Sequence, residues 1–117
     1  MVLSIIIPVF NVEDYVERCI LSTQNQDVAQ SEYEVVIIND GSTDRSLEIV
    51  QNISSNYRNV TVYNKSNGGL SSARNYGITH SNGTYIMFLD SDDWIATNCL
   101  QKLICQLKSE QPDCLGI

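Results

Sequence analysis

Residues 3–9 read LSIIIPV, and this stretch decides the fold of the chain. It is rich in β-branched side chains and contains one polar residue, Ser4, a composition typical of a short strand buried on both faces. A strand of this kind belongs to a parallel sheet with helices packed on both faces. The stretch therefore predicts an α/β fold, provided that strands and helices alternate along the rest of the chain.

They do alternate. Further strands are predicted at residues 34–38 (EVVII), 59–63 (NVTVY) and 84–89 (TYIMFL). Helices are predicted after Asn11, which can cap the first of them, and after Ser42 or Thr43, and then at residues 70–79 and 95–107. Residues 113–117 are typical of the start of another strand, so we expect the chain to be one incomplete domain, truncated at its C-terminus, within a longer protein.

Composition excludes several classes of protein. The net charge is −7 and only 7 residues are Lys or Arg, which argues against a nucleic-acid partner because nucleic-acid binding needs a clustered basic face. The 4 cysteines include no CxxC pair and there is one histidine, so we expect neither a zinc site nor a disulfide framework but reduced, mostly buried thiols in the cytoplasm. No signal peptide or membrane-spanning run is present, which leaves open peripheral association with the inner face of a membrane, and also a homodimer.

Polar residues follow three of the predicted strands: Phe10-Asn11, Asp40, and Asp90 to Asp93. Ligands of parallel sheets bind beyond the carboxyl ends of the strands, so this edge is the candidate site. Neighbouring carboxylates need a cation or hydrogen-bond donors to stay ionised together. Mg²⁺ and Mn²⁺ are hard cations, and Mg²⁺ typically takes one or two protein carboxylates and completes its shell with water and phosphate oxygens. The alternative is that Asp92 or Asp93 only caps the next helix.

The other segments at this edge also have two interpretations. Asp40 can accept the imide N–H of a uracil or thymine ring, or it can cap the following helix. Phe10 can lie against a base or belong to the core. The Asn67-Gly68-Gly69 loop and Arg74 can bind phosphate at a helix N-terminus, or the loop can be a simple turn.

Taken together, four segments resemble the family 2 glycosyltransferases of the GT-A fold. They read SIIIPVFNVEDYVERCILSTQNQ, YEVVIINDGSTDRS, NGGLSSARNYGI and NGTYIMFLDSDDW, and they cover nearly the whole chain in the order of the family. The resemblance implies a Rossmann-like domain, spanning residues 1–117, that binds a nucleoside diphosphate sugar, usually a uridine one, with Mg²⁺ or Mn²⁺. It implies hexosyltransferase-type chemistry of the EC 2.4 class in the assembly of cell-surface polysaccharide.

Carried over residue by residue, the resemblance places Asp40 at the base, Asp92 at the metal and Asp90 at the ribose or the metal. The expected donor-site residues are Pro8, Val9, Phe10, Asn11, Glu13, Asp40, Asn67, Arg74, Asp90, Ser91 and Asp92. Inverting members of the family use a downstream carboxylate as general base, and no segment of this chain matches it. We therefore expect no catalytic base before Ile117, no turnover by this chain alone, and an acceptor-binding part that is absent. The acceptor, a glycan or a lipid-linked one, is not specified.

Two rival functions remain. A homologue that binds the nucleotide sugar without transferring it would have the same sequence features, because the base is not present to inspect. A receiver-like signalling domain also places carboxylates at strand ends. That fold, however, needs an acidic pair after its first strand, where this chain has Pro8 to Asn11.

Overall fold

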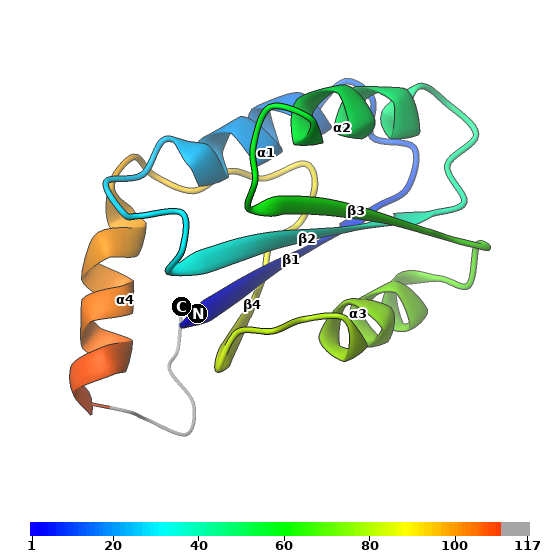
Figure 1. Ribbon diagram of the computed structural model, residues 1–117. Coiled ribbons are helices and arrows are strands. Elements are labelled where there is room, and N and C mark those ends of the chain that lie inside the picture. The colour runs from blue at the N-terminus through cyan, green and yellow to red at the C-terminus, as the bar shows by residue number, and fades with distance from the viewer. Residues whose placement is uncertain (111–117) are drawn as a thin grey trace.

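The computed structural model describes residues 1–110 and shows strands alternating with helices in the order that the sequence predicts (Figure 1). The strands are β1 (Leu3–Val9), β2 (Tyr33–Asp40), β3 (Val60–Lys65) and β4 (Tyr85–Phe88). The helices are α1 (Val16–Gln24), α2 (Ser46–Ser54), α3 (Leu70–Thr79) and α4 (Cys99–Glu110). The predicted strand start at residues 113–117 lies outside the described residues.

The four strands form one parallel sheet in the order β3-β2-β1-β4, with β1 in the interior. Helices α1 and α2 cover one face and α3 covers the other (Figure 1). The side chains of β1 alternate accordingly. Ile5 and Ile7 pack with the core on the α1 and α2 side, whereas Ile6 packs with Ala73 of α3. The prediction of an α/β fold with helices on both faces is confirmed.

The carboxyl end of the sheet opens between β1 and β4. Their pairing stops at Ile6 and Phe88, whereas β1 continues to pair with β2 as far as Val9. Pro8 lies in this last stretch, where only one neighbour requires ladder hydrogen bonds, which suits a residue without an N–H. The sheet order also reverses here, since β1 is flanked by β2 on one side and β4 on the other. Open α/β sheets bind ligands at such a crevice.

A buried polar network closes the opposite, amino end of β1. Glu34 is 8% exposed, and its carboxylate accepts hydrogen bonds from the Ser4 hydroxyl and the Asn82 N–H, both at 2.6 Å. The Ser4 hydroxyl accepts in turn from the Gly83 N–H at 2.8 Å. Because buried polar groups need partners, this network explains why the run LSIIIPV can contain a serine.

Two predicted helix caps are wrong. Asn11 does not cap α1. Its backbone is left-handed (φ 51°), and its Oδ1 accepts hydrogen bonds from the N–H groups of Thr43 and Asp44 at 2.8 and 3.3 Å. Neither Ser42 nor Thr43 caps α2, because Asp44 Oδ1 accepts the Ser46 N–H at 2.9 Å. The segments after β1 and β2 therefore bind each other through Asn11, while Asp44, in the second of them, accepts the first N–H of α2.

The last helix begins later than predicted, at Cys99 instead of Ile95. Residues 94–98 run along α1, where the Ile95 N–H donates to Ser22 Oγ at 3.1 Å. Asn98 has a left-handed backbone (φ 59°) immediately before α4. Asp93 therefore does not stand at the start of this helix, and its carboxylate accepts only the adjacent Trp94 N–H among the described contacts, at 2.9 Å.

Candidate nucleotide site

A cavity of about 430 Å³ lies at the carboxyl ends of the strands, and we call it the strand-end cavity. Its volume is within the range of small-molecule sites. Exposed apolar side chains, Phe10 at 47% and Leu70 at 52%, contribute to its wall, and Asp40 supplies a buried carboxylate. The lining residues are Pro8, Val9, Phe10, Asp40, Asn67, Gly69, Leu70, Ala73 and Ser91.

The Asp40 carboxylate in this cavity accepts three hydrogen bonds from the chain. One carboxylate oxygen, Oδ1, accepts from Lys65 Nζ and from the Gly68 N–H, both at 2.9 Å. The other, Oδ2, accepts from the Gly69 N–H at 3.0 Å. The Asn67 side-chain amide donates to the Asp40 carbonyl oxygen at 3.1 Å. The loop for which phosphate binding was one interpretation is therefore bound to Asp40, and the alternative that Asp40 caps the helix after β2 does not hold.

Burial pushes the pKa of Asp40 upward, but the hydrogen bonds from Lys65, Gly68 and Gly69 outweigh it and the net pKa is lowered. The pKa of Asp44 is lowered in the same way, because hydrogen bonds from Ser46 and from the Glu13 N–H exceed the effect of burial. Both carboxyl groups are therefore ionised at neutral pH.

These two carboxyl groups predict acid sensitivity. Since their pKa values in the folded chain lie below the ordinary value of 3.8, the unfolded chain binds more protons in acid. The stability they contribute is present above pH 3.8 and is lost as the pH falls through the folded values. Urea unfolding at pH 6, 4 and 3 should show this loss. Asp40→Asn should lose less stability than the wild type between pH 6 and 3, and equal losses would contradict the assignment to Asp40.

Arg74 and Asp90 lie beside each other next to the cavity. Arg74 comes from the second turn of α3 and its Nη2 is 3.7 Å from Asp90 Oδ1, while its guanidinium lies 5.3 Å from the centre of the Phe88 ring. The Arg74 Nε is buried and has no hydrogen-bond partner among the described residues. A buried donor without a partner is unusual and points to a missing acceptor.

Asp90, Ser91 and Asp92 follow β4 directly. The Asp90 side chain is 64% exposed, Ser91 is 9% exposed and lines the strand-end cavity, and Asp92 is exposed. The Cys19 thiol donates to the Asp90 carbonyl oxygen at 3.4 Å and fixes the backbone there. Burial, with the nearby Asp93, Asp92 and Asp90 carboxylates, raises the pKa of Cys19 to about 12, so this thiol remains a donor.

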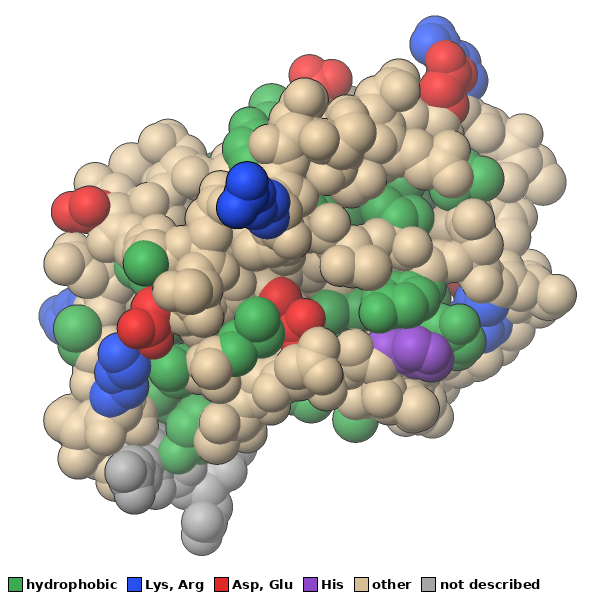
Figure 2. All heavy atoms as spheres, in the orientation of Figure 1, with side chains coloured by type: hydrophobic (Ala, Val, Ile, Leu, Met, Phe, Trp, Pro, Cys, Tyr) green, Lys and Arg blue, Asp and Glu red, His purple; other side chains and the backbone are tan. Residues whose placement is uncertain are grey.

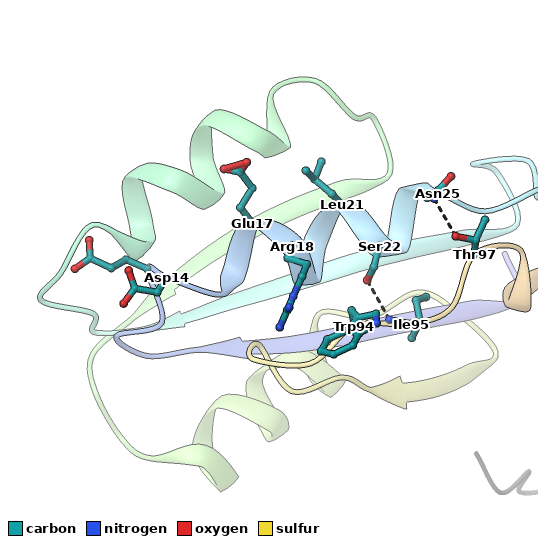
Figure 3. A pocket seen from close by; sticks show the side chains of 10 residues that line it. Asp14, Glu17, Arg18, Leu21, Ser22, Asn25, Trp94, Ile95 and Thr97 are labelled. Carbon is teal, nitrogen blue, oxygen red and sulfur yellow. Dashed lines mark hydrogen bonds between the residues drawn. The ribbon is translucent and has the colours of Figure 1, made fainter.

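Five of the predicted site residues do not line the strand-end cavity, namely Asn11, Glu13, Arg74, Asp90 and Asp92. Asn11 binds the turn after β2, as described above. Glu13 lines a second and larger cavity of about 710 Å³, which we call the α1 groove (Figure 3). There Arg18 lies 4.1 Å above the Trp94 ring, and Asn25 donates to Thr97 Oγ1 at 3.0 Å. The groove is lined by Glu13, Asp14, Glu17, Arg18, Leu21, Ser22, Asn25, Trp94, Ile95 and Thr97.

The distribution of charged side chains and cysteines agrees only in part with the predictions. Lys and Arg side chains stand apart on the face shown in Figure 2, without a basic patch there. Cys19 is buried, but Cys99 and Cys105 are exposed, so the prediction of mostly buried thiols is wrong for these two. Within residues 1–110, no helix has the length and apolar character needed to cross a bilayer.

Comparison with known proteins identifies the family. Residues 4–116 match Glycosyl transferase family 2, and the chain belongs to this family. It is 42% identical over 113 residues to an uncharacterized glycosyltransferase, EpsJ, of Bacillus subtilis, covering 97% of this chain and 32% of that protein. It is 38% identical over 115 residues to a poly(ribitol-phosphate) beta-glucosyltransferase of Bacillus spizizenii, covering 97% of this chain and 18% of that protein.

The fold agrees. The crystal structure of S. aureus TarS 1-349 in complex with UDP superposes with a TM-score of 0.88 at 27% identity, covering 100% of this chain and 38% of that chain. A complex of the same protein with UDP-GlcNAc gives 0.87 at 29% identity, with 37% of that chain covered. The predicted GT-A-like fold is thus confirmed. The chain spans about a third or less of the length of the two Bacillus relatives.

Proposed function

We propose that this chain is the nucleotide-sugar-binding part of a glycosyltransferase that takes a sugar from a uridine diphosphate sugar. One observation carries the proposal: Phe10, Asp40 and Ser91, from three separate strand ends, line one cavity beside Asp90 and Arg74. The apolar wall suits a base, the Asp40 carboxylate suits an imide N–H, and the partly exposed Arg74 guanidinium suits phosphate. The structures of TarS with UDP and UDP-GlcNAc support a uridine nucleotide.

The residues at the end of β4 also fit a divalent cation. Asp90 and Asp92 present exposed carboxylate oxygens, the hard ligands that Mg²⁺ and Mn²⁺ prefer. No group of three or more His, Cys, Asp or Glu side chains within residues 1–110 is arranged to hold a metal ion. A metal here would therefore have two protein ligands and would depend on the diphosphate for others. When bound, it would neutralise negative charge on the diphosphate leaving group.

Three residues of the chain would then bind different parts of the nucleotide. Asp40 would accept the base N–H, Phe10 would lie against the ring, and Arg74 would contact the phosphates. Because the chain belongs to this family, we also propose that transfer inverts the anomeric centre and that the acceptor belongs to a cell-surface glycan. The related poly(ribitol-phosphate) beta-glucosyltransferase supports a polymer acceptor of this kind. A general base beyond Ile117, a cytoplasmic location and a homodimer stay predictions.

Calorimetry with the 117-residue chain tests this function. The affinity for UDP should be about tenfold higher in the presence of Mn²⁺ than in the presence of EDTA, a difference in binding free energy of about 1.4 kcal/mol. Mn²⁺ titrated without nucleotide should bind weakly, since only two protein ligands are available. Equal UDP affinity with Mn²⁺ and with EDTA would contradict the metal assignment. Failure of the folded chain to bind UDP at all would contradict the proposed function.

A further inference from the structure

Lys65 forms a largely buried ion pair with Asp40 at the end of β3. The two residues stand opposite each other in the β2–β3 register, and their charged atoms are 2.9 Å apart. Their side chains are only 15% and 5% exposed. Nothing in the local sequence marks Lys65, which is one of a few basic residues in an acidic chain. Breaking a buried ion pair is costly, so a lysine held in this way needs a reason beyond surface charge.

The loop that follows Lys65 lies close to the end of β2 and to Lys65 itself. A Cβ added to Gly68 would come within 2.9 Å of Lys65 Nζ and 2.8 Å of Ser72 Oγ. A Cβ added to Gly41 would come within 2.8 Å of the Asn67 backbone nitrogen, and Gly41 has φ of 73°. Lys65 also donates to the Ser66 carbonyl oxygen at 2.7 Å. The lysine therefore joins β2, β3 and the loop at one point.

These contacts leave a defined acceptor on Asp40. An ionised carboxylate offers about four acceptor positions and no donor. Oδ1 accepts from Lys65 and Gly68, and Oδ2 accepts from Gly69, so three positions are used within the chain. Among the contacts of residues 1–110, one position remains, on Oδ2. Without Lys65 a second acceptor position would open on Oδ1, so the carboxylate would no longer offer a single fixed position to a ligand.

We infer that Lys65 is a positioning residue that makes Asp40 selective for a base with an imide N–H. Uracil has a donor N–H at this position of its ring, whereas cytosine has an unprotonated nitrogen, which a carboxylate repels. Holding Asp40 as an acceptor with one free position should favour UDP over CDP by attraction to one base and repulsion of the other. This inference rests on the proposed function, because it assigns a role within the same nucleotide site.

Calorimetry with two nucleotides tests it. UDP and CDP, each with Mn²⁺, are titrated into the wild-type chain and into Lys65→Met, Lys65→Arg and Lys102→Met. We expect the wild type to prefer UDP, and we expect Lys65→Met to reduce the UDP-to-CDP affinity ratio by about tenfold, which corresponds to about 1.4 kcal/mol. Lys65→Arg should recover most of the ratio. Lys102 is exposed on α4, so Lys102→Met removes an equal charge and should leave the ratio unchanged.

The outcomes separate the inference from the function it rests on. Binding of UDP by the wild type with an unchanged ratio in folded Lys65→Met would overturn the role of Lys65 and leave the nucleotide site standing. No binding of either nucleotide to the folded wild type would overturn the proposed function itself. If circular dichroism shows that Lys65→Met is unfolded, Lys65→Gln, which keeps a donor without the charge, takes its place and should reduce the ratio in the same direction.

Discussion

Replacing Asp40 with alanine should lower the free energy of unfolding by about 3 kcal/mol, the lower end of the cost of breaking a buried ion pair. The substitution leaves Lys65 without its carboxylate and removes the acceptor of two backbone N–H groups, those of Gly68 and Gly69. The cost stays at the lower end because Lys65 keeps its hydrogen bond to the Ser66 carbonyl oxygen. For a domain of this size the melting temperature should fall by roughly 10 °C.

Thermal unfolding followed by circular dichroism measures this effect, with Asp27→Ala as the matched control. Asp27 is an exposed aspartate, and its removal should change the free energy of unfolding by no more than about 0.5 kcal/mol. If Asp40→Ala and Asp27→Ala had equal free energies of unfolding, the contacts of Asp40 would make no net contribution to stability. The conclusion that Asp40 holds the loop of residues 66–69 in place would then be wrong.

The second large effect is expected at the end of β4. Replacing Asp92 with asparagine should abolish the strengthening of UDP binding by Mn²⁺, because it removes one of only two proposed protein ligands. Loss of even outer partners of a metal ligand typically lowers metal affinity about 10- to 100-fold, so loss of a direct ligand should cost at least as much. UDP affinity in EDTA should stay close to that of the wild type, since Asp92 does not line the strand-end cavity.

Asp93→Asn is the matched control for this experiment. It removes the same charge one residue further along, where the side chain accepts the Trp94 N–H and is not proposed to bind metal. The Mn²⁺ effect should survive in Asp93→Asn. Its loss in both variants would indicate a general effect of negative charge, and its retention in Asp92→Asn would show that Asp92 is not a ligand.

The sequence predicted those parts of the structure that depend on local patterns. The apolar runs marked all four strands, and the polar residues at their ends identified Pro8, Phe10, Asp40 and Ser91 as neighbours. This worked because parallel strands bring their carboxyl ends to one edge. The family resemblance, which rested on four ordered segments, is borne out by the family match over residues 4–116.

What the sequence did not reveal depends on partners distant along the chain. Asparagine is a common helix cap, but the Oδ1 of Asn11 accepts hydrogen bonds from N–H groups of the segment after β2. Lys65 is 25 residues from Asp40, and only the β2–β3 register shows that they are opposite each other. The late start of α4 follows from contacts of residues 95–100 with α1, such as that of Ile95 with Ser22. Periodicity contains no information on these pairings.

The interior position of β1 also bears on how the chain folds. Its first residue pairs with Tyr33 on one side and with Tyr85 on the other, so the pairing with β4 closes most of the chain into a loop. Pairings of such long sequence separation form slowly. During synthesis the βαβ unit of β1, α1 and β2 can form early. One edge of β1, however, stays unpaired until β4 has left the ribosome. The residues proposed to bind metal follow β4 directly, so the site is complete only after β4 has paired with β1.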